Sequence, residues 1–413
     1  MVFFYILYIF SGVLKSFLLY YHIPFPVNLT LLSAIFLVIA IIFDIIRNGI
    51  KQKINKSFLL AISSILILYI WMIFSLLYTP SPNYSYIKTF YFLTNILAFI
   101  YPFIIKDFEM KSFVKYFILT TIFFSIFFLI NYSKILKSYY TGESDITGLY
   151  LVLGTLLGIS LMLLATSKEI IFSKRILNSI LIFIILIMIF LLGARGPLFF
   201  SLGLIILYFF TNKYKIIYKK LSVNIIRTII FSLIISIVGF SVIYLSFKNK
   251  IDPYAQRTFH RIEVMVTNPK NNTENSSVKV RLDQINYSLE KIFESPESFI
   301  IGQGIGSFNL LYKGEDGRGY PHNIFLEVWF ELGIIGELFF LTFFAVLLIR
   351  YPRNKIISHW LLLFIILNMQ KSNSLIDIRT YFAFFAMFLI SQQNKKQNEQ
   401  NENLSIDIST PEI

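Results

Sequence analysis

The sequence is long and strongly apolar, with 413 residues of which 56% are hydrophobic, 18% aromatic and only 15% charged. A mean hydropathy of +0.70 excludes an ordinary soluble protein of this length and favours a polytopic membrane protein. The absence of cysteine excludes disulfides and thiolate chemistry. The net charge of +14 does not indicate a nucleic-acid partner, because the basic residues fall mainly in short loops between apolar runs.

Apolar runs of membrane length follow one another along the chain. The first run lacks a basic n-region and a small-residue cleavage site, so we expect it to be retained. A window of about 20 residues predicts about twelve spans, at residues 2–20, 28–46, 57–77, 87–105, 112–131, 146–166, 176–193, 197–211, 225–246, 324–349, 356–369 and 378–391. The predicted fold is therefore an all-α polytopic membrane protein, with transmembrane helices in 1–246 and again in 322–391.

Lysine and arginine gather on one side of these spans. If the N-terminus is cytoplasmic, so are the basic loops 47–56, 167–175, 212–224 and 350–355. The opposite loops HIPFPVN and TPSPNYSY contain neither residue type. This asymmetry predicts cytoplasmic N- and C-termini. The polar tail 392–413 is expected to be disordered in the cytoplasm.

One long extracytoplasmic loop, 247–321, interrupts the pattern. Its segment VRLDQINYSLEKIFESP has Val280, Ile285, Leu289 and Ile292 near helical spacing, which predicts an amphipathic helix on the membrane surface. The following stretch IIGQGIGSF contains Gly302, Gly304 and Gly306. We expect a tight loop there that exposes backbone N–H groups.

The stretch YPHNIFLEVWFELGIIG carries polar groups into the next apolar run. Pro321 suits the first position of a helix, which would run unbroken to Leu348 over roughly 42 Å. His322 and Asn323 would then lie in its first exposed turn. The positive end of the helix dipole would keep His322 neutral and able to accept a proton, although a histidine that only caps the helix is equally compatible.

Asn323, Glu327 and Glu331 share one face of this predicted helix. Charged groups at membrane depth are costly unless they meet a partner or a wet cavity, so this face should point into the protein. Two interpretations stay open: an ion pair that holds helices together, or a part in catalysis. Other charged residues within the spans, Lys88 among them, are isolated or near span ends and are expected to snorkel or pair.

The turn GARGP is a second polar intrusion. Gly193 would end one helix and Pro197 begin the next, with Arg195 held at the outer surface. Arg281 begins the amphipathic helix on the same side. Guanidinium groups bind phosphate in a bidentate manner, so arginines converging beside the glycine loop would make a diphosphate site. A snorkelling role for Arg195 is the alternative.

Together these motifs resemble the O-antigen ligase and O-antigen polymerase superfamily. HNIFLEVWFELGIIG is similar to the family's H-N-x-x-L and E-x-G-x-x-G signature, IGQGIGSF to the segment before it, and GARGP to its S-R-G turn. The motif order and about twelve spans agree as well. Ala194 departs from the pattern, because the family usually has serine there.

The resemblance implies a metal-independent, inverting glycosyl transfer on the outer face of a bacterial cytoplasmic membrane, by a GT-C-like fold without a cofactor. Arg195 and Arg281 would bind the diphosphate, and His322 would be the general base. Gly304, Gly306, Asn323, Glu327 and Arg318 are the candidate substrate-binding residues. Arg257, Arg261 and Arg318 could contact phosphate or sugar, or be solvated loop residues like His260.

Three functions fit the sequence. A polymerase would join repeat units from an undecaprenyl-diphosphate-linked oligosaccharide donor to a glycan acceptor, and this is the favoured prediction. A ligase would transfer the finished glycan to lipid A core or to another acceptor. A glycolipid or anion transporter is the third, and a chain-length regulator or flippase is a conceivable partner.

Overall fold

The computed structural model describes residues 1–23, 27–49, 56–106, 108–140, 148–172, 174–217, 277–349 and 356–390. Within these ranges the chain forms helices and loops and no β-strand, which confirms the predicted all-α class for this part. The helices are α1 (Val2–Tyr20), α2 (Leu29–Asn48), α3 (Lys56–Ser75), α4 (Tyr84–Ile104), α5 (Met110–Tyr140), α6 (Leu149–Thr166), α7 (Arg175–Leu192), α8 (Arg195–Ile217), α10 (Ser277–Ile292), α11 (Pro296–Ile300), α12 (Ser307–Lys313), α13 (Ile324–Ile349), α14 (His359–Ser372) and an unlabelled helix Arg379–Ile390.

Eight helices of the described part are long and apolar enough to cross a membrane, namely α1 to α7 and α13. Arg195–Thr211 and Arg379–Ile390 are shorter apolar helices, and α14 coincides with another predicted span. The chain is therefore a polytopic membrane protein. The predicted span 225–246, the tail 392–413 and Arg257, His260 and Arg261 lie outside the described residues, and the total of about twelve spans and the GT-C likeness stay predictions.

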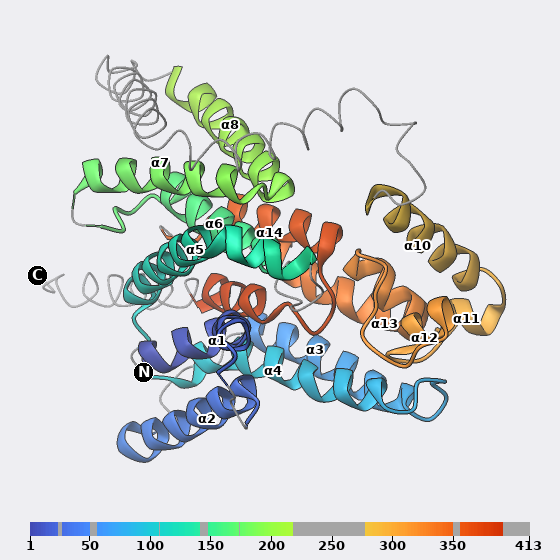
Figure 1. Cartoon of the computed structure of the whole chain (residues 1–413). Helices are drawn as coiled ribbons and strands as arrows, with labels where there is room; N and C mark the ends of the chain where they lie inside the picture. The colour runs from blue at the N-terminus through green and yellow to red at the C-terminus, as the bar shows by residue number, and fades with distance from the viewer. Residues whose placement is uncertain are drawn as a thin grey trace, which may run out of the picture.

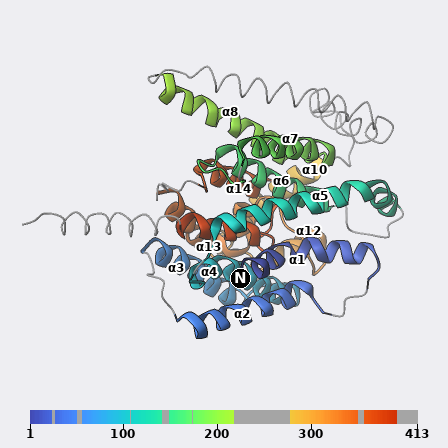
Figure 2. The same cartoon turned by 90° about the vertical axis from the view of Figure 1, so that its left-hand side faces the viewer.

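The long helices lie side by side as a bundle, and α10, α11 and α12 gather at one end of it, opposite the N-terminus (Figure 1). In both views α2 and α8 lie at opposite edges, with α13 and α14 between them (Figures 1 and 2). Helix α13 packs on α3 and α14 along the bundle and on α10, α11 and α12 at the end. It therefore connects the apolar core to the helices of the predicted extracytoplasmic loop.

Aromatic side chains join the middle of the bundle. Phe343 of α13 contacts Phe99 of α4 and Phe382 of the last helix, at ring-centroid distances of 5.7 and 5.3 Å. All three are buried. In a membrane the lipid is as apolar as these side chains, so their benefit comes from close packing of the rings.

Glycines on α6 let its neighbours approach closely. A Cβ added to Gly154 would collide with the Cβ of Ala194, and one added to Gly158 would collide with the ring of Phe364 on α14. The four-residue spacing puts both glycines on one face, as in the small-residue contacts of membrane helices. Ala194 thus packs where the related family usually has serine. Gly193 ends α7 in the left-handed region as predicted (φ 66°), but α8 already begins at Arg195 and not at Pro197.

The predicted amphipathic helix exists as α10, but it packs on α13 and α11. Ile292 is fully buried with Phe308, Leu326 and Phe330, and Ile285 packs against this group. Val280 and Leu289, which were expected to share the apolar face, are exposed. Only part of the predicted apolar face of α10 therefore packs against the protein.

Candidate functional site

Helix α13 differs from its prediction at both its start and its middle. It begins at Ile324, and Asn323 precedes it: the Asn323 side-chain oxygen accepts hydrogen bonds from the N–H groups of Phe325 and Leu326. Asn323 is thus the helix cap, and the expectation that His322 lies in the first turn is wrong. The expected continuous helix is wrong too, because Gly333 has non-helical angles (φ 66°, ψ −174°).

The glycine loop fits into this break in α13. A Cβ on Gly302 would lie 2.6 Å from the carbonyl oxygen of Glu331, and a Cβ on Gly333 would lie 2.5 Å from the backbone nitrogen of Ile301. Both glycines have positive φ, at 80° and 66°. Only glycine can supply both the backbone conformation and the space, so the two glycine motifs read from the sequence interlock.

The carbonyl groups that the break leaves without helical partners find other donors. Gln303 N–H donates to the Phe330 oxygen (2.8 Å), Gly304 N–H to that of Glu331 (2.9 Å), and the Trp71 indole to that of Leu332 (2.8 Å). Unpaired backbone groups at membrane depth would cost several kcal/mol each. The loop and α3 therefore stabilise the irregular backbone.

The expectation that the glycine loop exposes its N–H groups is wrong at the two residues assigned to substrate. Gly304 N–H bonds to a backbone oxygen, and Gly306 N–H donates to the Glu331 carboxylate at 3.0 Å. A Cβ at Gly304 would also lie 2.5 Å from Thr79. Substrate binding by Gly304 and Gly306 stays a prediction, without these backbone donors to support it.

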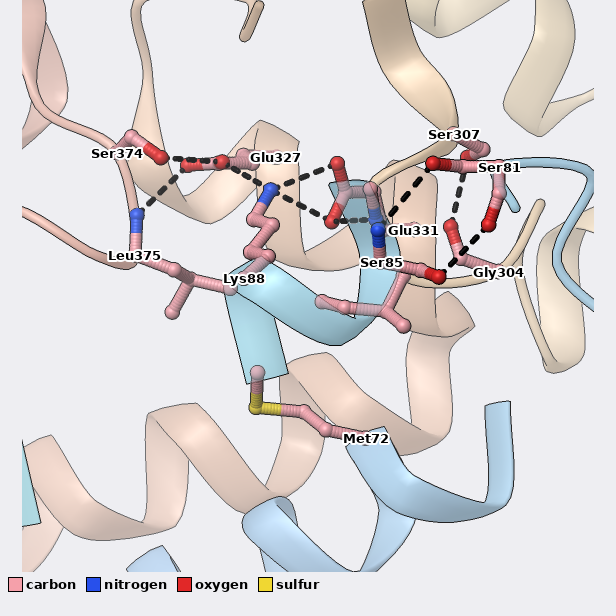
Figure 3. A network of polar contacts seen from close by, with 12 residues as sticks. Met72, Ser81, Ser85, Lys88, Gly304, Ser307, Glu327, Glu331, Ser374 and Leu375 are labelled. Carbon is pink, nitrogen blue, oxygen red and sulfur yellow. Dashed lines mark hydrogen bonds and ion pairs between the residues drawn. The ribbon is translucent and has the colours of Figure 1, made fainter. Parts of the chain in front are cut away.

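Lys88 of α4 lies between the two glutamates of α13 (Figure 3). Its ammonium is 2.5 Å from Glu327 and 2.7 Å from both oxygens of Glu331, and all three side chains are fully buried. Glu327 also accepts from the Ser374 hydroxyl (2.7 Å) and the Leu375 N–H (3.0 Å). The network thus joins α4, α13, the glycine loop and the loop after α14.

This network explains how two carboxylates can sit inside an apolar bundle. Each is paired with a charge and hydrogen-bonded, which is what buried carboxylates require. The ion-pair interpretation of the glutamates agrees with this geometry. Glu327 remains a predicted substrate-binding residue, but its two oxygens already accept from Lys88, Ser374 and Leu375.

His322 lies immediately before α13 in a conformation that is rare for a non-glycine residue (φ 58°). Such backbone strain costs about 1–3 kcal/mol and is held by its surroundings. The ring packs edge-on against Tyr320 at 4.7 Å, and its Nδ1 is buried with no hydrogen-bond partner in the described part of the chain. Burial, then the charges of Arg281 and Lys313, lower the pKa of His322 to about 4. His322 is therefore neutral at physiological pH, as predicted.

The charges of the other two predicted catalytic residues act on a lysine, Lys371, that the sequence patterns did not single out. Arg281 is in α10, Arg195 begins α8, and Lys371 is in the last turn of α14. The charge of Arg281 acts on both His322 and Lys371, and that of Arg195 acts on Lys371. Segments far apart in the chain thus bring these groups within electrostatic range of one another. Lys371 is the group on which the charges of both Arg195 and Arg281 act.

Arg318 bonds to Asp377 in the loop after α14, at 2.5 Å, and just over half of its side chain is exposed. The Asp377 charge raises the pKa of Arg318. Nearby, Asp316 accepts from the Ser81 hydroxyl and the Asn83 N–H, and these bonds lower its pKa. Both pairs tie the segment before His322 to neighbouring loops, and the predicted contact of Arg318 with substrate would compete with Asp377.

Two surface cavities of about 350 Å³ lie away from these groups. One is apolar and lies between α2 and α4, lined in part by Leu31 and Phe90. The other lies beside Lys111 and Lys115 of α5. Neither contains a predicted site residue. Within the described ranges no three His, Asp or Glu side chains form a group able to hold a metal ion.

Comparison with protein families gives a match over residues 180–341 to a family described as O-Antigen ligase. This part of the chain is similar to that family. This confirms the predicted superfamily and supports an enzyme that transfers glycans in polysaccharide biosynthesis at a membrane. Comparison with curated proteins gives no match.

The O-antigen ligase match extends from α7 into α13, so Arg195, Arg281 and His322 lie inside it. Lys88 and Lys371 lie outside it, although their side chains meet residues of the matched region. A charge balance could have found Lys88, since two glutamates at membrane depth call for a cation in another span. No local signal distinguishes Lys371 from a lysine at an ordinary helix end.

Proposed function

We propose that this protein is an inverting glycosyltransferase that uses an undecaprenyl-diphosphate-linked glycan as donor and polymerises surface polysaccharide repeat units. The observation that carries the proposal is that the charge of Arg281 acts on both neutral His322 and Lys371, and that the charge of Arg195 acts on Lys371 as well. Cations that receive the diphosphate and a base that receives a proton are the two requirements of this reaction.

In the proposed reaction an acceptor hydroxyl attacks the anomeric carbon of the donor sugar. The new C–O bond forms as the bond to the diphosphate breaks, and the configuration inverts. His322 takes the hydroxyl proton, and undecaprenyl diphosphate leaves with the bonding electron pair. Arg195 and Arg281 bind the charge that develops on it, through charge-assisted hydrogen bonds of about 1.5–3 kcal/mol each.

The low pKa of His322 fits this scheme because the donor is an anion. Burial lowers the pKa of the imidazole most, and the positive charges of Arg281 and Lys313 lower it further. A bound diphosphate would offset those two charges and raise the pKa of His322, so the imidazole becomes a better base only when the donor is in place.

Ligation is the second candidate, and the family description O-Antigen ligase favours it. A ligase would transfer the glycan to lipid A core or another acceptor by the same donor chemistry. The identity of the acceptor therefore distinguishes a ligase from a polymerase. Purified protein in liposomes with lipid-linked oligosaccharide should extend lipid-linked units if it is a polymerase, and only glycosylate lipid A core if it is a ligase.

The test of catalysis uses His322→Ala and Arg281→Ala in the same assay. We expect each to lower the turnover about 10²–10⁴-fold, because a positioned base or a transition-state cation is lost. Lys291→Ala is the matched control. Lys291 lies on the same helix as Arg281, but at the opposite end of that helix, where it is paired with Glu294. Retained turnover in both variants, or movement of intact lipid-linked glycan across the liposome membrane without transfer, would overturn the proposal.

A further inference from the structure

A cavity of about 350 Å³ lies where α5 begins, beside the loop between α6 and α7. It has a polar wall on α5 and an apolar wall on the loop, namely Lys111, Ser112 and Lys115 against Ile170, Ile171 and Phe172. Helix α5 is long and apolar enough to cross a membrane, so a cavity at its first turns lies at the depth of lipid headgroups. The distribution of lysine and arginine predicts that this surface is cytoplasmic.

The apolar wall is held in place by the protein. Ile171 and Phe172 are buried, and the Phe172 N–H donates to the side-chain oxygen of Asn178 on α7 at 3.1 Å. Ile170, in contrast, is 38% exposed although it is apolar. The loop thus supplies a fixed apolar wall with one exposed aliphatic side chain.

The two lysines of the polar wall form no ion pair with a carboxylate of the described residues. They are one helical turn apart, and the Lys115 ammonium lies 5.9 Å from the centre of the Phe172 ring, which joins the polar wall to the apolar one. Glu109, two residues before Lys111, accepts from the Ser112 hydroxyl at 2.6 Å. In this part of the chain both ammonium groups are therefore available to an anion.

The charge of the surrounding segments favours an anion as well. Residues 106–115 and 168–175 contain six basic and three acidic residues, which leaves a net charge of +3. A soluble anion would use only the cationic wall of the cavity, and an uncharged lipid would use only the apolar wall. A molecule with an anionic headgroup and a hydrocarbon chain would use both, and basic pockets at a membrane surface bind such lipids.

We infer that this cavity binds the phosphate headgroup of an anionic phospholipid from the cytoplasmic leaflet. Lys111 and Lys115 bind the phosphate, and Ile170 contacts the first part of an acyl chain. The inference is independent of the proposed glycosyl transfer, because none of these residues belongs to the candidate site around His322. A bound lipid joins α5 to the loop between α6 and α7, so it should stabilise the folded protein.

The test places the full-length protein in nanodiscs of dioleoylphosphatidylcholine and follows the Tm as dioleoylphosphatidylglycerol is added. The double variant Lys111→Gln/Lys115→Gln should raise the apparent Kd for phosphatidylglycerol about ten- to hundredfold, since charge-assisted contacts to the phosphate are lost. Both lysines are exposed, so in pure phosphatidylcholine the variant should melt like the wild type. A lower Tm there, with an unchanged Kd, would show a structural role and overturn the inference.

The double variant Lys168→Gln/Lys174→Gln is the matched control. It removes two positive charges from the same surface, at exposed lysines that do not line the cavity. At physiological salt such charges act on the headgroup only through a screened surface potential, so the Kd should rise only a few-fold. Equal losses in the two double variants would show a diffuse attraction between the basic surface and anionic lipid, and would overturn the inference.

Two further measurements identify the source of the phosphate. Ile170→Ser should weaken phosphatidylglycerol binding several-fold, because the acyl chain loses an apolar contact while both lysines remain. Inorganic phosphate in excess over the lipid should not reduce the rise in Tm. Displacement of the lipid by inorganic phosphate would assign the cavity to a soluble anion and overturn the inference, as would wild-type affinity of Ile170→Ser.

Discussion

Two groups of charges in this protein are built from similar parts and differ in their balance. Around Lys88, one cation and two carboxylates from α4 and α13 satisfy one another at 2.5–2.7 Å, fully buried. Around Lys371, the charges of Arg281 and Arg195 act on the lysine, and within the described residues no ion pair joins a carboxylate to Lys371. The first group needs nothing from outside the chain. In the second, the charges that act on the lysine are both positive.

The comparison separates stability from activity. Charges that are already paired inside the bundle should matter when the fold is challenged, because removing one leaves the others uncompensated. Charges held together against their repulsion should matter when a ligand binds, and they cost stability in its absence. Variants in the two groups should therefore change different measured quantities.

Lys88→Met is expected to have the largest effect on folding. It leaves Glu327 and Glu331 buried without their cation, which should lower the free energy of unfolding by about 3–5 kcal/mol. Denaturant or thermal unfolding in detergent measures this. Lys15→Met, at an exposed lysine of α1, is the control. Adding Glu327→Gln and Glu331→Gln to Lys88→Met should recover part of the lost stability, because no buried carboxylate then lacks its cation. If Lys88→Met instead melts at the wild-type temperature, the ion pairs around Lys88 do not stabilise the fold, and the contrast between the two groups of charges is wrong.

Gly333→Ala comes next. Its backbone conformation is one that other residues rarely adopt, and the new Cβ would lie 2.5 Å from the Ile301 nitrogen. The strain should cost about 1–3 kcal/mol. Gly203→Ala is matched to it: Gly203 lies in α8 with open space around it, so alanine there should be neutral or stabilising by up to about 1 kcal/mol. Equal stability of the two variants would mean that the break in α13 does not need glycine.

The pH dependence should show the smallest but most specific effect. The pKa of His322 in the ligand-free protein is about 4, because burial and then Arg281 and Lys313 disfavour the imidazolium. The value of kcat/KM should therefore fall only as the pH approaches 4. A bound diphosphate offsets the two cations, so the acid limb of kcat should lie at higher pH than that of kcat/KM. A kcat limb at or below the kcat/KM limb would contradict the proposed contact between the donor and this cluster.

The sequence predicted which residues are candidates for the site better than it predicted how they are arranged. His322 and Arg195 could be selected because their motifs stand at the ends of apolar runs, and Arg281 because it begins the predicted amphipathic helix on the same side. The roles of the glycines were misjudged, since a glycine-rich loop looks the same whether its N–H groups face a ligand or, as for Gly304 and Gly306, an acceptor in the protein. The break at Gly333 was missed because the apolar run continues on both sides of it.

What the sequence by itself determined is the helical membrane class and the order of the motifs along it. Apolar runs of about 20 residues must satisfy their backbone groups internally in lipid, so they form helices whatever their neighbours are. Tertiary structure alone decided the pairing of Lys88 with Glu331, which are 243 positions apart, and the approach of Lys371 to Gly196. Such contacts depend on how helices pack and on which way each side chain points, and no local pattern encodes either.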